Sequence, residues 1–142
     1  MKVTLERQNK AVHFHAKGDS GHIVNIDGGP TSGGEEKGSR PMELVLMAAG
    51  GCSSIDIHLI LKKMRQPVDD LRIEVHGERV DAVPAVFRKI TFYYHFKGDL
   101  KAEKVKQAID MSLDKYCSVS KMLDHHVEMA YEFTINGELI NL

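Results

Sequence analysis

Cysteine is the residue type in this chain best suited to chemistry, and the chain holds only two, Cys52 and Cys117. They lie 65 residues apart (117 − 52), a spacing that excludes CxxC chemistry and a small zinc knot. The spacing suits two thiols that folding brings together, one to attack a substrate and one to resolve the oxidised product as a disulfide. We therefore predict a redox-active pair of cysteines that are remote in sequence.

Cys52 lies within the apolar stretch 41–64, which we predict to be a buried central helix. A thiol attacks as thiolate, a form that a nearby positive charge or a helix N-terminus favours, and the middle of a helix is too far from either end to feel the helix dipole. Gly50 and Gly51 precede the cysteine, and each glycine inside a helix costs about 1 kcal/mol relative to alanine. The pair suggests a kink or close packing, and a break there would place Cys52 at a new helix N-terminus. The plain alternative is a buried free cysteine that packs as a small hydrophobe.

Cys117 occupies a different local setting. It follows a predicted helix that ends at Tyr116, and it precedes Ser118 and Ser120, either of which can cap a further short helix. Backbone N–H groups are exposed at such a junction and favour a thiolate.

The elements that must position the two thiols follow from apolar periodicity. A hairpin is predicted over residues 2–15 and a third strand over 22–26, followed by a Gly-, Pro- and Ser-rich loop at 27–40. Ser39 is the predicted cap of the central helix, with Pro41 in its first turn. The remaining predicted elements are strands at 71–80 and 86–97, a helix at 102–116, a short helix ending at 123 or 124, and a strand at 127–136. The order βββ-α-ββ-α-β predicts an α+β fold with a largely antiparallel sheet.

Composition narrows the class of protein. A chain of 142 residues, 42% hydrophobic and 27% charged, is expected to form one globular domain over residues 1–142. The net charge of −1 gives no general attraction to nucleic acid or to an anionic membrane. The alternating, polar N-terminus lacks the apolar core of a signal peptide, and Glu43, Asp56 and His58 interrupt the central helix as a membrane span. We expect a cytoplasmic protein, in which a dithiol is catalytic, redox-sensing or inert.

The segments around both thiols resemble two motifs of the OsmC/Ohr family. Residues 41–52 read PMELVLMAAGGC, which resembles (N)P-x-E-L-x-x-x-A-x-x-x-C, and residues 117–123 read CSVSKML, which resembles C-P-V-S-x-x-L. The order of elements over residues 1–137 also matches. The run SRPMEL at 39–44 is most similar to the YhfA-like branch of that family.

The resemblance implies a thiol-dependent hydroperoxide reductase that acts as an intertwined homodimer. It implies that Cys52 is the peroxidatic thiol, that Cys117 is the resolving thiol, and that Glu43 is the active-site glutamate. The family also uses an arginine upstream of that glutamate, and here only Arg7 and Arg40 precede it. We take Arg40, three residues before Glu43, as the group that favours the thiolate and orients the peroxide while Glu43 holds it.

The sequence departs from the family pattern in two ways. Arg40 is closer to Glu43 than in better-known members, and Ser118 stands where the second motif has proline. In addition, Glu43 and Cys52 are nine residues apart, which on a straight helix means about 13.5 Å of rise and about 900° of rotation. The two side chains then point to opposite faces. They share a site only if the glycine pair bends the helix or, as we favour, if Glu43 comes from the partner subunit.

The apolar surroundings of Cys52 favour organic or lipid hydroperoxides as substrates, and a dithiol reductant of lipoyl or thioredoxin type would complete the cycle. We expect no cofactor and no metal. His13 and His15 share a strand face, but no cysteine or acidic residue is recruited beside them. Two other functions remain open: a small-molecule or lipid binding protein with inert cysteines, and a redox sensor whose disulfide alters a partner contact.

Overall fold

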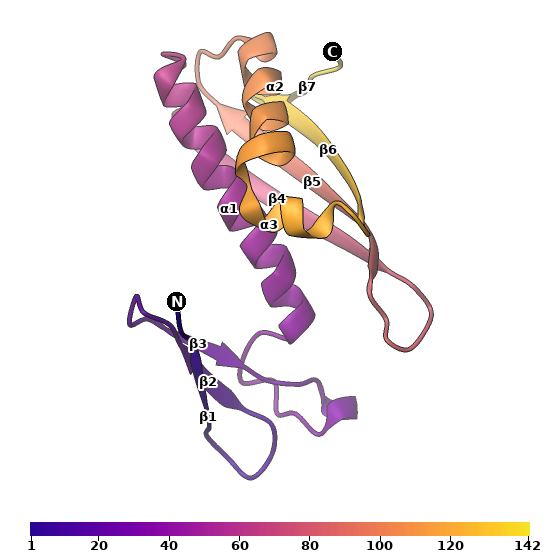
Figure 1. Cartoon of the computed structure of the whole chain (residues 1–142). Coiled ribbons are helices and arrows are strands. Elements are labelled where there is room, and N and C mark those ends of the chain that lie inside the picture. Colours follow the sequence, from indigo (N-terminus) through magenta and orange to yellow (C-terminus); the bar gives the residue numbers. More distant parts are fainter. The chain divides into compact units, whose positions relative to one another are not determined.

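The computed structural model describes all 142 residues, which form two compact units, Met1–Val45 and Leu46–Leu142. Each unit is described by itself. The helices and strands, labelled in Figure 1, are β1 (Thr4–Arg7), β2 (Phe14–Lys17), β3 (Ile23–Ile26), η1 (Pro30–Ser32), α1 (Pro41–Lys63), β4 (Asp70–Arg79), β5 (Phe87–Lys97), α2 (Ala102–Met111), η2 (Ser112–Tyr116), α3 (Ser118–Leu123), β6 (Glu128–Ile135) and β7 (Glu138–Leu139).

The first unit contains a three-stranded antiparallel sheet of order β1-β2-β3. The predicted hairpin and third strand are therefore confirmed. The predicted loop follows, and the buried Asp27 organises it, because its carboxylate accepts hydrogen bonds from the backbone N–H groups of Gly28, Glu35 and Lys37. These bonds, the one from Lys37 above all, lower the pKa of Asp27 below its usual value. A long loop with such a centre keeps a defined path to the start of α1.

The start of α1 corrects the predicted helix cap. The helix begins at Pro41, so the capping position belongs to Arg40 and not to Ser39. Ser39 is instead bridged to Ile26 in the manner of a parallel strand. The carboxylate of Glu43 accepts a hydrogen bond from the backbone N–H of Arg40 at 2.8 Å, which is the reciprocal half of a capping box.

Helix α1 runs without interruption from Pro41 to Lys63. Of the two readings of the glycine pair, the break is therefore wrong, and Cys52 lies inside a continuous helix. Close packing is confirmed at Gly50, where a Cβ atom would lie 2.9 Å from the side chain of Val75. The expectation that this apolar helix is buried on all sides is also wrong for a single chain. Met47, Ile55 and Leu59 are 56%, 64% and 49% exposed, and with Gly51 they recur every four residues.

By length and composition, α1 is the one helix that passes a test for membrane spans, with a mean hydropathy of 1.8 over its most apolar 18 residues. Core helices of soluble proteins pass the same test. The buried side chains of Ile57, Ile60 and Leu61 lie at the three- and four-residue spacing of a helix that packs one face into a core. We interpret α1 as such a core helix, with a second apolar face left open.

The second unit is built on a four-stranded sheet of order β4-β5-β6-β7. The pairs β4–β5 and β6–β7 are antiparallel, as predicted for most of the sheet, whereas β5 and β6 run parallel. The parallel pairing follows from the helical connection between these strands, since parallel neighbours need a long crossover. The short strand β7 and the division of the strands between two separate sheets are features that the sequence pattern did not predict.

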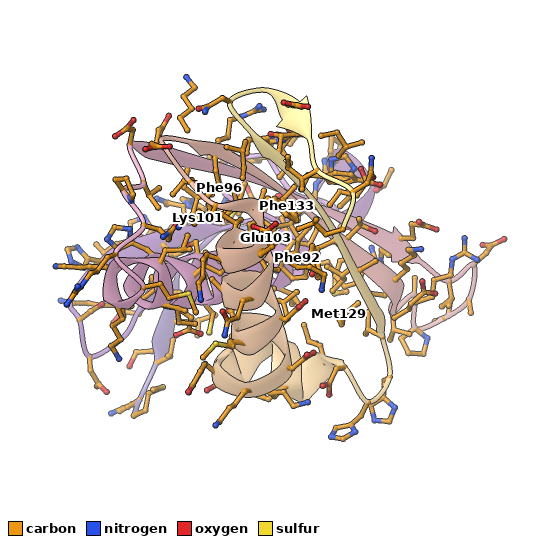
Figure 2. All side chains as sticks on the ribbon, turned by 90° about the horizontal axis from the view of Figure 1, so that it is seen from above. Phe92, Phe96, Lys101, Glu103, Met129 and Phe133 are labelled. Atoms are coloured by element: carbon orange, nitrogen blue, oxygen red, sulfur yellow. The ribbon has the colours of Figure 1, made fainter.

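One face of this sheet forms the core. Along β5 the side chains of Phe92, Tyr94 and Phe96 alternate inward and are at most 1% exposed. Phe96 of β5 and Phe133 of β6, both labelled in Figure 2, stack edge-to-face with their ring centroids 6.5 Å apart. Figure 1 shows the part of α1 in this unit and α2 side by side over the same face. The sheet is thus a rigid base for both helices.

The predicted helix 102–116 divides into two kinds of turn. It is α-helical from Ala102 to Met111, and it then widens into a π-helical turn from Ser112 to Tyr116. Such turns are rare and are frequent at functional sites. Here the wide turn ends directly at Cys117, and the six-residue helix α3 begins at the next residue.

Candidate functional site

The structure brings the two cysteines together in the second unit. The sulfur atoms of Cys52 and Cys117 lie within 4.8 Å of one another, and both thiols are free. Cys52 is partly exposed, whereas Cys117 is fully buried at 0% exposure. The pair is therefore asymmetric, because Cys52 is a partly exposed residue and Cys117 is a fully buried one. A disulfide requires these sulfurs to approach to about 2.05 Å.

Cys117 is held by the start of α3. It is the N-cap residue of that helix, and its sulfur accepts hydrogen bonds from the backbone N–H of Ser120 at 3.4 Å and from the Ser120 hydroxyl at 3.1 Å. The prediction of N–H groups aimed at this sulfur is thus confirmed. Burial raises the pKa of the Cys117 thiol above its usual value, and this effect is larger than that of the hydrogen bonds from Ser120, which favour the thiolate and lower the pKa. The resting Cys117 side chain is accordingly a neutral thiol near pH 7.

Cys52 is fixed through the residue that follows it. The buried Ser53 hydroxyl accepts a hydrogen bond from Tyr94 of β5 at 3.0 Å and donates one to the carbonyl of Gly50. The Ser53 carbonyl in turn accepts a hydrogen bond at 3.2 Å from the hydroxyl of Ser112, the first residue of the wide turn. One buried network therefore ties α1, the sheet and the segment before Cys117 together, and it sets the spacing of the two sulfurs.

The site contains a third polar group, the carboxylate of Asp56, which was not predicted from the sequence. Asp56 lies one helical turn after Cys52 on α1, and a carboxylate oxygen of Asp56 lies within 4.8 Å of both sulfurs. Its Oδ2 atom is buried and has no hydrogen-bond partner. The four-residue spacing from Cys52 was the available signal, because residues four apart share one face of a helix. From the sequence, Asp56 was recognised only as a charged residue that interrupts the central helix as a membrane span.

A pocket of about 300 Å³ opens beside Asp56. Apart from the aspartate and Lys63, its lining is largely apolar: Leu59, Ile60, Met64, Met111 and Tyr116. Met64 thus lines this pocket, whereas Met47 lies on the exposed face of α1. The site thus combines two sulfurs, a carboxylate and an adjoining apolar recess.

Arg40 and Glu43 belong to the first unit, and their contacts there differ from the expected pairing. The Arg40 guanidinium pairs with Glu36 at 3.1 Å, and the Glu43 carboxylate bonds the backbone N–H of Arg40. Both side chains are exposed, so neither is held by burial. His13, considered for metal binding, shares a hydrogen bond with Asn25 at 2.8 Å.

Comparison with known proteins identifies relatives over most of the chain. A sequence model of a family described as "OsmC-like protein" matches residues 34–132. Protein YhfA of Escherichia coli (strain K12) is 42% identical over 123 residues, which cover 86% of this chain and 89% of YhfA. The matched segment 34–132 includes both motifs and both cysteines.

Solved structures show the same architecture. A crystal structure of a hypothetical protein from Aquifex aeolicus VF5 matches with a TM-score of 0.80 and 33% identity, covering 95% of this chain and 96% of that one. The organic hydroperoxide resistance protein OhrB of Bacillus subtilis matches with a TM-score of 0.66 and 21% identity, over 94% and 96% of the two chains. The second likeness concerns the fold alone.

Proposed function

The chain belongs to the family of OsmC-like proteins, and from that premise we propose that it reduces organic hydroperoxides with a thiol pair, as part of defence against oxidative stress. Cys52 is the peroxidatic residue and Cys117 the resolving residue. The observation that carries the proposal is the approach of these two sulfurs to within 4.8 Å, although 65 residues separate them in the chain (117 − 52).

The difference in burial supports the division of roles. A peroxidatic sulfur must meet a substrate from solvent, and Cys52 is the partly exposed one. A resolving sulfur meets only the oxidised partner, and Cys117 is fully buried beside it. Because burial raises the pKa of Cys117, this thiol keeps its proton until the sulfenic acid forms next to it. The arrangement separates attack from resolution.

The reaction has three steps. The Cys52 thiolate attacks the peroxide O–O bond, so that one oxygen stays on sulfur as sulfenic acid and the alcohol leaves with a proton. Cys117 then attacks the sulfenic sulfur; its proton and the hydroxyl group leave as water, and a disulfide forms. A dithiol reductant, of lipoyl or thioredoxin type, exchanges with this disulfide and restores both thiols.

The pocket beside Asp56 supports an organic substrate. Its apolar lining, about 300 Å³ in volume, favours an alkyl or aryl peroxide over hydrogen peroxide, since burial of apolar surface contributes about 25 cal/mol per Å². The Bacillus subtilis protein of similar fold is an organic hydroperoxide resistance protein, which agrees with this substrate class. The physiological compartment in this proposal is the cytoplasm.

Arg40 and Glu43 keep the roles that the family resemblance implies. In the proposal, the Arg40 guanidinium leaves its exposed pairing with Glu36 and orients the peroxide at Cys52, with Glu43 holding it. In the proposal, the Arg40 guanidinium moves within a homodimer. The open apolar face of α1 offers the contact for the second chain. Each chain's Glu43 then serves the partner's thiol.

The direct test is consumption of cumene hydroperoxide with dihydrolipoamide or dithiothreitol as reductant. The wild type should turn over, Cys52→Ser should fall to the background rate, and Cys117→Ser should lose turnover because it cannot form the disulfide that the reductant reduces. Ser54→Ala, a neighbouring residue on α1 whose hydroxyl bonds only the Gly51 carbonyl, is the matched control. Equal rates for wild type and Cys52→Ser would remove the enzyme assignment and favour a binding or sensing role.

A further inference from the structure

Three side chains at the site together form an arrangement that the thiol chemistry alone does not need. A sulfur of Cys52, a sulfur of Cys117 and a carboxylate oxygen of Asp56 all lie within 4.8 Å of one another. Cys52 and Asp56 share one face of α1 at four-residue spacing, and Cys117 approaches from the start of α3. All three belong to the second unit, so a single chain supplies the whole cluster.

The carboxylate is the group that stands out. Its Oδ2 atom is buried without a hydrogen-bond partner, and a buried acceptor in that state is costly unless something satisfies it. The two neighbouring thiols become acceptors as well once they ionise. One positively charged centre among the three is the simplest way to satisfy every acceptor at once, because a proton satisfies only one of them.

We propose that the reduced protein binds one thiophilic divalent cation of the Zn²⁺ class through Cys52, Asp56 and Cys117. Binding of the cation displaces one proton from each thiol, and the carboxylate completes a set of three ligands. The mixture of two soft sulfurs with one oxygen selects Zn²⁺ or Cd²⁺ over Mg²⁺ and Ca²⁺, which prefer sets of oxygen ligands.

The geometry fits such an ion. Tetrahedral zinc with Zn–S distances of about 2.3 Å requires its sulfur ligands to be roughly 3.8 Å apart, and the sulfurs of Cys52 and Cys117 lie at most 4.8 Å apart, about 1 Å more than that at the upper bound. The bonds from the Ser120 N–H and hydroxyl to the Cys117 sulfur are the outer contacts that orient a metal thiolate. Cys52 is partly exposed, which gives the ion a path, and three protein ligands leave a fourth position open.

Oxidation must then release the ion. A two-electron oxidant such as diamide takes one electron from each metal-bound thiolate and two protons from water, so that its N=N bond becomes a hydrazine, the two sulfurs join as a disulfide and the cation is released to solvent. A disulfide has no thiolate to donate, so only Asp56 remains and the set of ligands is lost. The set of three ligands is therefore present in the reduced protein and absent from the oxidised protein.

The test uses reduced, metal-free full-length protein and no peroxide, so its outcome is separate from that of the peroxidase assay. Zn²⁺ is titrated against a chromophoric chelator, and Cd²⁺ is followed through the ultraviolet charge-transfer band of cadmium thiolate. We expect one ion per chain, binding at least about tenfold weaker in Asp56→Asn, and no charge-transfer band in Cys52→Ser. Diamide should release the bound ion, and dithiothreitol followed by its removal should restore binding.

The matched control is Asp114→Asn, which removes one negative charge from an exposed residue of the same unit. Its affinity should equal that of the wild type. Because Cys117 is buried, both Cys117→Ser and Cys117→Ala are measured, with circular dichroism to verify the fold. Unchanged affinity in Asp56→Asn, one ion per two chains, or binding that survives conversion to the disulfide would each overturn the proposal.

Discussion

The hydroxyl of Tyr94 on β5 donates a hydrogen bond of 3.0 Å to the hydroxyl of Ser53 on α1, and this contact anchors the residue next to Cys52 to the sheet. Tyr94 is 0% exposed, as is Ser53. The Cys52 sulfur therefore owes its position to a buried polar pair as well as to the helix that carries it. Ionisation of the Tyr94 phenol would remove the hydrogen that it donates to Ser53.

We predict that Tyr94→Phe changes the pH dependence of stability. Burial raises the pKa of Tyr94, so the folded protein keeps the phenol proton where the unfolded chain loses it, above about pH 10. The stability that the protonated phenol contributes is present below that pH and falls by about 1.4 kcal/mol per pH unit above it. Loss of the hydrogen bond costs the variant about 1 kcal/mol at neutral pH.

Urea unfolding from pH 8 to 11 in the presence of reductant measures this effect. The stability gap between wild type and Tyr94→Phe should narrow above pH 10. Tyr116→Phe is the control, because that side chain is 46% exposed. A gap that stays constant across the range would show that the phenol is not shielded from water in the folded state.

The two glycines of α1 should respond in opposite directions to alanine. A Cβ atom at Gly50 would lie 2.9 Å from the side chain of Val75 on β4, whereas one at Gly51 would meet nothing within 4 Å. Both changes gain about 1 kcal/mol of helix propensity, but overpacking of a core costs about 1–3 kcal/mol. We expect Gly50→Ala to lower the free energy of unfolding of the chain relative to Gly51→Ala.

Chemical denaturation of the two variants at equal protein concentration makes this comparison. The double variant Gly50→Ala/Val75→Ala should recover most of the loss, since it removes the methyl group that the new Cβ meets. If Gly50→Ala were as stable as Gly51→Ala, the close approach of α1 to β4 would be contradicted.

The open apolar face of α1 predicts self-association. Met47, Ile55 and Leu59 are about half exposed or more, and their spacing of four and eight residues places them on one face of the helix. Exposed apolar stripes of this kind mark interaction surfaces. Ile55→Glu should convert a dimer into a monomer, because a charge cannot be buried there without a partner.

Light scattering during size exclusion measures the mass. The control is Val83→Glu, at an isolated and fully exposed valine in the β4–β5 connection, and it should leave the mass unchanged. A wild type that is monomeric at micromolar concentration would remove both the dimer and the role of Glu43 across subunits.

Ser120 should influence how the rate of disulfide formation by Cys117 depends on pH. Its hydroxyl and N–H bonds to the Cys117 sulfur oppose the effect of burial, which raises the pKa of that thiol. In Ser120→Ala the pKa of Cys117 should rise further, so the rate of closure should shift to more alkaline pH while oxidation of Cys52 is unaffected. Quenched-flow trapping with dimedone separates the two steps, with Ser118→Ala as control. A pH profile of disulfide formation that is unchanged in Ser120→Ala, or that shifts to lower pH, would contradict this role.

Much of the fold was predictable because it depends on local pattern. The alternation of Phe92, Tyr94 and Phe96 predicted a strand with one buried face, and the run of apolar residues after Pro41 predicted the central helix. The cap at Arg40 was missed because the β-bridge of Ser39 to Ile26 is a contact between segments remote in sequence. The parallel pairing of β5 with β6 was missed for the same reason.

The site was predictable only in part. Motif resemblance singled out Cys52 and Cys117, and the structure brings their sulfurs together. Asp56 was within reach through its four-residue spacing from Cys52, but its significance depends on the approach of Cys117 from another helix. The burial that raises the pKa of Cys117 depends on tertiary packing, which no local pattern of serines and backbone N–H groups encodes.

The central claim is that peroxide joins Cys52 and Cys117 in one chain, and counting thiols tests it most directly. Reduced protein receives one equivalent of cumene hydroperoxide without reductant, and free thiols are titrated under denaturing conditions beside an intact-mass measurement. We predict loss of both thiols per chain, a mass lower by two hydrogens, and an intrachain peptide pair linking the two cysteines. Two remaining thiols per chain, or oxidation of Cys52 to higher acids with Cys117 still free, would contradict the account.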